Sequence, residues 1–258
     1  MQNFNHTSFM NTVLDFGEAM MGCGAEVSRV EDSIKRICAS YGYKDTQLMA
    51  ISVGIVLTIT PPDSDARTQL RRCSSGGNNF SRLSELNALS RMVCETTPSL
   101  ETFSKKLAVI LTPDTSRRTY IKNGIGAILA ACGCTVFFGG TVADCIPTTI
   151  CALLIFFLDK HLKSKTPNAS AYNFVSALLS GILAVTICNF LPFNRDMVII
   201  GIIMLLIPGI LLTNSMRDML LGDTLTGSAR LFEAVLGAAC LAAGITVAIL
   251  LFGGGVRI

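Results

Sequence analysis

Histidine is scarce in this chain, because only His6 and His161 occur among 258 residues. This shortage argues against a histidine-based catalytic site and against a His-rich metal site. The phosphate loop G-x-x-x-x-G-K-[ST], the zinc motif H-E-x-x-H and paired C-x-x-C motifs are missing as well. We therefore expect no bound cofactor and no metal.

Charge is also sparse: charged residues make up 15% of the chain, apolar residues make up 50%, and the mean hydropathy is +0.54. Such a composition is too apolar for an ordinary soluble domain and predicts a membrane protein. The start of the chain lacks the basic region of a cleaved secretory signal, so we expect the N-terminus to stay in the cytosol. The ten cysteines are scattered or lie in apolar runs, which indicates small buried thiols in a reducing compartment.

The charged residues lie mostly before residue 120 and the apolar runs lie after it. This division predicts a cytosolic α+β domain at residues 1–118 and a transmembrane domain at residues 119–258. In the first domain, apolar residues repeat with helical spacing near both ends, and the β-branched run "TQLMAISVGIVLTIT" predicts strands.

The second domain contains apolar segments close to the roughly 20 residues that a helix needs to cross a bilayer. We predict an all-α bundle of five transmembrane helices. Basic residues gather on the flanks that face the same side as the N-terminal domain, which places the N-terminus in the cytosol and the C-terminus outside. The five segments are about 123–140, 143–158, 173–192, 197–213 and 231–252.

The fourth segment ends in a helix breaker followed by polar residues. Pro208 and Gly209 predict a kink or break. If the helix then resumes, Asn214, Arg217 and Asp218 share one face. Two interpretations stay open for this face: an interfacial helix with its charges among lipid headgroups, or the polar lining of a pathway mouth.

Other charged residues near the membrane have local explanations as well as functional ones. Asp144 follows a glycine turn and is either a loop or helix-cap residue, or an outer gate or proton site. Asp223, which ends the polar segment, is a further pathway candidate. Arg230 and Glu233 lie one turn apart at the start of the last span and are expected to form an interfacial ion pair.

A charged helix lies near the N-terminus, in "GAEVSRVEDSIKRI". Arg29 lies three residues before Asp32, and Glu31 and Asp32 lie four residues before Lys35 and Arg36. All can pair along one helix surface. The face is either a solvated surface or a docking and regulatory surface beneath the membrane domain.

The order of these motifs resembles the threonine/serine exporter family, of the ThrE and YjjP kind. The resemblance is carried by "GAEVSRVEDSIKRI", then "GGTVAD", then "PGILLTNSMRDMLLGDTLTGSARLFEA", and it covers nearly the whole chain. The motif positions are Arg29, Glu31, Asp32, Gly139, Gly140, Asp144, Pro208, Gly209, Asn214, Arg217, Asp218, Gly222, Asp223, Gly227 and Arg230.

The resemblance implies a secondary exporter of small amino acids such as threonine and serine, or of a dicarboxylate such as succinate, in a bacterial plasma membrane. Long members of the family carry a second block of spans that this chain lacks, so we expect a second small multispan subunit or a homo-oligomer. Besides that partner we expect a small-molecule substrate and a lipid bilayer, and no nucleic acid. Two other functions stay open: a membrane-anchored hydrolase or sensor, and a structural partner subunit.

Overall fold

The structure, a computed structural model, describes residues 5–61, 65–73, 77–113, 116–163, 165–166 and 168–253. The chain forms two compact units. The first consists of Met1–Pro113 with Asn214–Arg230, and the second consists of Asp114–Thr213 with Leu231–Ile258. The structure thus groups residues 214–230 with the N-terminal part, whereas the predicted division into residues 1–118 and 119–258 places them in the second domain.

The first unit contains a small antiparallel sheet with strand order β1-β2-β3. Its strands are β1 (Thr46–Ile51), β2 (Gly54–Ile59) and β3 (Arg67–Arg72). Alternate residues of β2, including Ile55 and Leu57, are fully buried against the helices. The β-branched run predicted to form strands therefore supplies the inner face of the sheet through alternate residues of β2.

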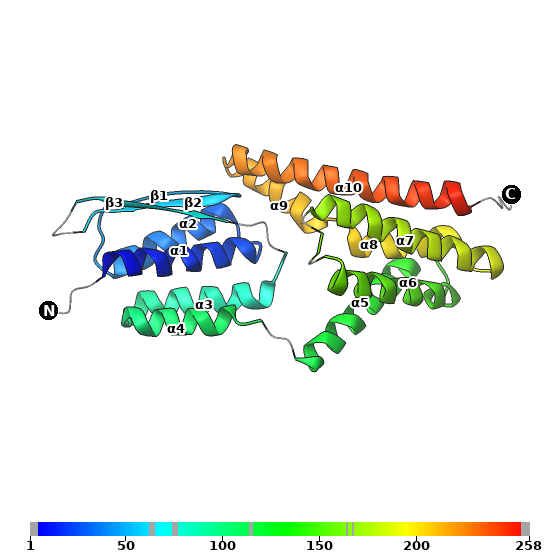
Figure 1. Cartoon of the computed structure of the whole chain (residues 1–258), viewed down its shortest axis with the longest axis horizontal. Coiled ribbons are helices and arrows are strands. Elements are labelled where there is room, and N and C mark those ends of the chain that lie inside the picture. The colour runs from blue at the N-terminus through cyan, green and yellow to red at the C-terminus, as the bar shows by residue number, and fades with distance from the viewer. Residues whose placement is uncertain are drawn as a thin grey trace. The chain divides into compact units, whose positions relative to one another are not determined.

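Helices form two layers on that inner face (Figure 1). The layer against the sheet holds α1 (His6–Gly22) and α2 (Val27–Ser40), and the next holds α3 (Phe80–Thr96) and α4 (Leu100–Leu111). The apolar stripes of these helices meet in one core, as their spacing predicts.

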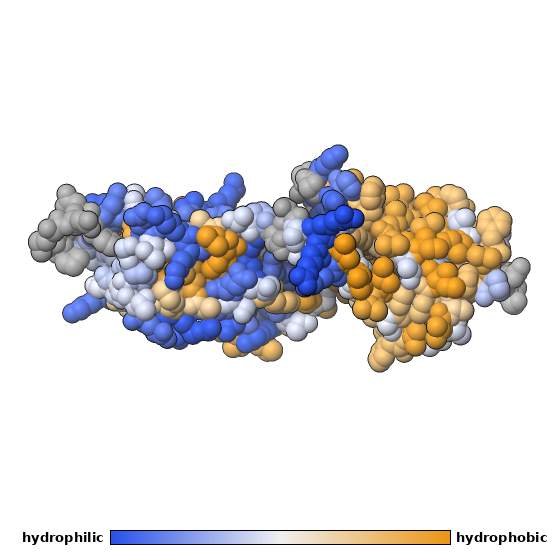
Figure 2. Space-filling model, turned by 90° about the horizontal axis from the view of Figure 1, so that it is seen from below, coloured by the Kyte–Doolittle hydropathy of each residue, from blue (hydrophilic) through white to orange (hydrophobic). Residues whose placement is uncertain are grey.

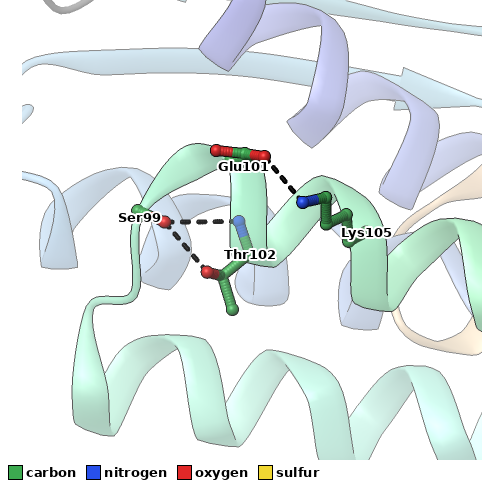
Figure 3. Close-up of polar contacts among 4 residues, drawn as sticks. All are labelled: Ser99, Glu101, Thr102 and Lys105. Atoms are coloured by element: carbon green, nitrogen blue, oxygen red, sulfur yellow. Dashed lines mark hydrogen bonds and ion pairs between the residues drawn. The ribbon is translucent and has the colours of Figure 1, made fainter.

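The start of α4 shows how local sequence sets a helix boundary (Figure 3). The Ser99 hydroxyl accepts the backbone N–H of Thr102 at 3.3 Å, and the Ser99 and Thr102 hydroxyls are 2.9 Å apart. One turn further, Lys105 pairs with Glu101 at 2.6 Å. The cap satisfies a backbone donor that no residue within the helix can bond.

The second unit is helical, and apolar residues cover most of its face in Figure 2, where the first unit is largely hydrophilic. The 3₁₀ turn Val142–Asp144 leads from α5 into α6. The helices are α5 (Arg117–Phe137), α6 (Cys145–His161), α7 (Ala169–Phe190), α8 (Arg195–Leu206), α9 (Gly209–Leu220) and α10 (Thr224–Phe252), of which α9 and α10 extend into the first unit.

Four helices of the described residues are long and apolar enough to cross a membrane: α5, the segment Val142–His161, α7 and α10. The helices α8 and α9 make a fifth crossing if they count as one bent span. These elements overlap all five apolar segments predicted from the sequence, and the number of five spans stays a prediction. The predicted exit of the C-terminus falls on residues 254–258, outside the described residues.

Small residues allow the helices of this unit to pack closely. A Cβ atom on Gly244 of α10 would lie 2.6 Å from the carbonyl oxygen of Phe174 in α7. A Cβ atom on Gly181 of α7 would lie 2.9 Å from the Cβ of Ala248 in α10. This contact uses the small residues that the sequence concentrates in the last span.

All ten cysteines lie in the described part of the chain and are free. Cys38 and Cys73 are buried in the first unit, where burial raises the pKa of the Cys38 thiol to about 12 and that of Cys73 to about 11. Both thiols therefore stay protonated near neutral pH and are poor nucleophiles.

Candidate functional site

The turn between α9 and α10 brings two charged helix ends together. Gly222 has a φ of +100°, and the next residue, Asp223, donates its backbone N–H to the carbonyl of Asp218 at 2.9 Å. This is the Schellman arrangement, in which glycine takes the left-handed position. A Cβ atom on Gly227 would lie 2.8 Å from the carbonyl of Ser215, so glycine also lets α10 approach α9.

A buried ion pair joins the two helices of this hairpin. Nη1 of Arg230 donates to Oδ2 of Asp218 at 2.8 Å, and the two side chains are 11% and 2% exposed. The sequence prediction paired Arg230 with Glu233, which instead is exposed. The helix spacing that favoured Glu233 is overridden because the tight turn places Asp218 opposite Arg230 and out of water.

A second ion pair lies beside the first one and joins α9 to α2. Nη1 of Arg217 lies 2.5 Å from Oε1 of Glu26, with side chains 58% and 20% exposed. The carboxylates of Glu26 and Asp223 both act electrostatically on Asp218. We call Arg217, Glu26, Asp218, Asp223 and Arg230 the hairpin cluster; it holds three carboxylates and two guanidinium groups.

The helix break predicted at Pro208 lies just before this cluster in the chain. The helix α8 ends at Leu206, α9 begins at Gly209, and the two are bent by 53°. Asn214, the remaining pathway candidate of α9, is half-buried one turn before Asp218, which is buried, whereas Arg217 is exposed. The three polar residues predicted to share one face therefore differ in their access to solvent.

Asp144 lies in the corner between α5 and α6 and is 3% exposed. Its Oδ2 accepts the backbone N–H and the hydroxyl of Thr141, both at 2.8 Å, and its Oδ1 accepts the backbone N–H of Asn194 at 2.8 Å. The carboxylate thus closes its own turn and ties it to the turn between α7 and α8. This geometry favours the cap interpretation over a gate.

Sequence reasoning missed a row of buried hydroxyl groups on α7. Tyr172, Ser176 and Ser180 recur every four residues and are nearly or fully buried. The Ser180 hydroxyl donates to the Ser176 carbonyl at 2.6 Å, whereas the Tyr172 and Ser176 hydroxyls make no hydrogen bond of normal geometry within the described residues. The i, i+4 spacing in "YNFVSALLS" was the available signal.

Among the described residues, no three His, Cys, Asp or Glu side chains come together as a metal-binding group. His6 bonds the hydroxyl of Tyr43 through Nδ1 at 2.6 Å. Among the ion pairs of the described residues, Asp218–Arg230 is the most buried, and the hairpin cluster contains it.

A family model described as "Putative threonine/serine exporter" matches residues 11–252. The chain belongs to the threonine/serine exporter family. Comparisons with curated proteins and with solved structures gave no match. As a member of this transporter family with several long apolar helices, the chain is a membrane-embedded transporter.

In this family member, the predicted charged face of α2 has several roles. Glu31 accepts the backbone N–H of Ala50 in the edge strand β1 at 2.8 Å, so it supports the sheet. Asp32 pairs with Arg36 at 2.6 Å on the exposed surface, and Arg29 is exposed. Of the three motif residues, only Glu31 reaches another element of secondary structure through a hydrogen bond between described residues.

Glu26 was not predicted as a site residue from the sequence, although a signal existed. Glu26 occupies the N-cap position of α2, where Ser, Thr, Asp and Asn are preferred, and its side chain makes no capping hydrogen bond. A carboxylate that does not cap the helix is available for another partner, and here that partner is Arg217.

Proposed function

We propose that this chain is a subunit of a gradient-driven exporter that carries threonine or serine across a bacterial plasma membrane, with the N-terminus in the cytosol. The family match supports the substrate class. The observation that carries the proposal to particular residues is the Arg217–Glu26 pair, an exposed guanidinium in contact with a half-buried carboxylate.

This pair suits a zwitterion. A substrate carboxylate can replace that of Glu26 on Arg217, because a guanidinium binds carboxylates through two parallel hydrogen bonds. Glu26 is then released to receive the substrate ammonium. Exchange of one ion pair for two leaves no charge unpaired, which keeps the desolvation cost low. The buried Asp218–Arg230 pair holds the hairpin in place and is not the ammonium site.

The charges of the hairpin cluster favour an amino acid over a dicarboxylate. Three carboxylates stand against two guanidinium groups, and Arg230 is already engaged by Asp218. Succinate would bring two further negative charges beside the carboxylates of Glu26 and Asp223, and neighbouring like charges repel. A zwitterion adds no net charge.

We also propose a second small multispan subunit as the partner. Four or five spans are few to enclose an alternating-access pathway. Co-purification of one further multispan protein with the tagged chain from native membranes supports this arrangement. Recovery of the chain alone, still active in threonine efflux after reconstitution, contradicts it.

The proposal is tested by threonine efflux from loaded cells that express the chain in its native genetic context. Arg217→Ala abolishes efflux while the amount of the protein in the membrane stays unchanged. Arg217→Lys retains part of the efflux, because lysine keeps the positive charge but cannot form the two parallel hydrogen bonds of a guanidinium. The matched control is Arg36→Ala, since Arg36 is also exposed and ion-paired. Wild-type efflux by Arg217→Ala removes this residue from the pathway.

A further inference from the structure

An apolar groove of about 380 Å³ runs between α5 and α6. Its lining includes Tyr120, Gly124 and Ile128 of α5, and Leu153 and Phe156 of α6. A Cβ atom on Gly124 would lie 3.2 Å from the ring of Phe156, whose centroid is 4.7 Å from that of Tyr120. Glycine and the tilted rings thus form the floor of the groove.

The groove opens toward the outside of the helix bundle. Ile125 on one wall is 53% exposed, and Leu153 and Phe157 on the other are 48% and 54% exposed. In a membrane-embedded helix pair, such side chains face lipid or another apolar partner.

Two basic residues stand at one end of this groove. On α5, Arg117 lies four residues before Ile121 and seven before Gly124, which places it on the groove face. On α6, Lys160 follows Leu153 and Phe156 on the groove face, and its Nζ lies 4.2 Å from the centroid of the Tyr120 ring. The helices are antiparallel neighbours, so the start of α5 and the end of α6 meet.

None of the ion pairs within the described residues includes Arg117 or Lys160. The nearby acid Asp159 is engaged by Lys163 at 2.8 Å. Arg117 and Lys160 are both exposed and charged at the mouth of an apolar groove. The chemistry complementary to this arrangement is an anionic head joined to a hydrocarbon tail.

We propose that the α5/α6 groove binds an anionic phospholipid, with its phosphate at Arg117 and Lys160 and an acyl chain along Gly124, Ile128 and Leu153. A basic pocket between transmembrane helices is suited to such headgroups. A zwitterionic lipid fits less well because it adds a cation of its own at this end. A transmembrane helix of another subunit would need an acidic side chain at the same depth to satisfy both cations.

The test uses the purified full chain in detergent, with lipid binding measured by native mass spectrometry. Phosphatidylglycerol binds about tenfold more tightly than phosphatidylcholine with the same acyl chains. Arg117→Ala/Lys160→Ala removes this preference. The matched control Lys122→Ala/Lys165→Ala removes the same charge near the same helix ends and keeps the preference, because Lys122 lies about 140° around α5 from Arg117 and Lys165 follows the end of α6.

A second variant tests the groove separately from the charges. Leu153→Trp fills the groove and weakens phosphatidylglycerol binding while both cations stay in place. Glycerol phosphate, the free headgroup chemistry, fails to compete. The proposal is overturned if both charge variants lose the preference equally or if glycerol phosphate competes effectively. It is also overturned if a cross-linker placed at position 153 captures a second protein chain instead of lipid.

Discussion

The two helical corners α5–α6 and α9–α10 share the same turn geometry. They differ in the groups that contact a buried aspartate. Each turns at a glycine with positive φ, +105° at Gly139 and +100° at Gly222. Asp144 and Asp218 are both almost fully buried. Asp144 accepts three hydrogen bonds from uncharged groups, whereas Asp218 faces a guanidinium.

The contacts of the aspartate distinguish a structural joint at the α5–α6 corner from a charged site at the α9–α10 corner. Neutral donors fix a carboxylate in one geometry and leave no charged group that a substrate can engage. At the other corner, the buried pair holds a second, more exposed pair next to it, and exposed ion pairs are exchanged at low cost. We therefore propose that the α9–α10 corner takes part in transport and that the α5–α6 corner has a structural role.

The largest expected effect follows removal of Asp218. Asp218→Ala leaves Arg230 buried and unpaired and lowers the free energy of unfolding by about 3–5 kcal/mol. The double variant Asp218→Ala/Arg230→Ala loses clearly less than the sum of the two single losses. Thermal unfolding in detergent measures all three variants, and strict additivity would show that the two side chains do not interact.

Asp144→Ala comes next. It leaves three donors without an acceptor and destabilises the chain by about 2 kcal/mol. Because Asp144 acts as a joint, threonine efflux per folded molecule stays at the wild-type level. Efflux normalised to membrane-inserted protein checks this, and a loss of efflux at full stability would return Asp144 to the list of pathway residues.

The two turn glycines give a smaller and equal effect. Gly139→Ala and Gly222→Ala each destabilise by about 1 kcal/mol, because alanine disfavours positive φ. Neither added Cβ meets an atom within 4 Å, so the cost comes from the backbone alone. Unfolding curves of the two variants test the equality, and a markedly larger loss at one turn would break the likeness of the corners.

The smallest effect on stability is expected at Arg217. Its pair with Glu26 is more than half exposed on the arginine side, so Arg217→Ala changes the free energy of unfolding by less than about 1 kcal/mol. The same variant that abolishes efflux thus unfolds at nearly the wild-type temperature. A fall in the unfolding temperature as large as that of Asp218→Ala would indicate that Arg217 is a structural residue.

Local pattern predicted the elements of this fold well, because helix and strand periodicities are short-range properties. Positions such as Phe9 and Val13 of α1, or Ile55 and Leu57 of β2, lie in the core as their spacing predicts. The break before Gly209 also follows from a local rule, the missing donor of proline.

The partners in the candidate site were not predictable in the same way, because they depend on the turns. Glu233 is the helical neighbour of Arg230, but the α9–α10 turn brings Asp218 to it. Asn194 reaches Asp144 across 50 residues. Glu26 meets Arg217 through the tertiary fold, and only its unusual place at a helix N-cap marked it.

The most direct test of the account is competition for labelled L-threonine binding to membranes that contain the chain with its native neighbours. The account predicts that unlabelled threonine and serine compete, whereas threonine amide, which lacks the carboxylate, and 3-hydroxybutyrate and succinate, which lack the ammonium, do not. Arg217→Ala and Glu26→Gln each abolish the specific binding. Competition by succinate as effective as that by threonine, or full threonine binding in Arg217→Ala, would contradict a zwitterion site at this pair.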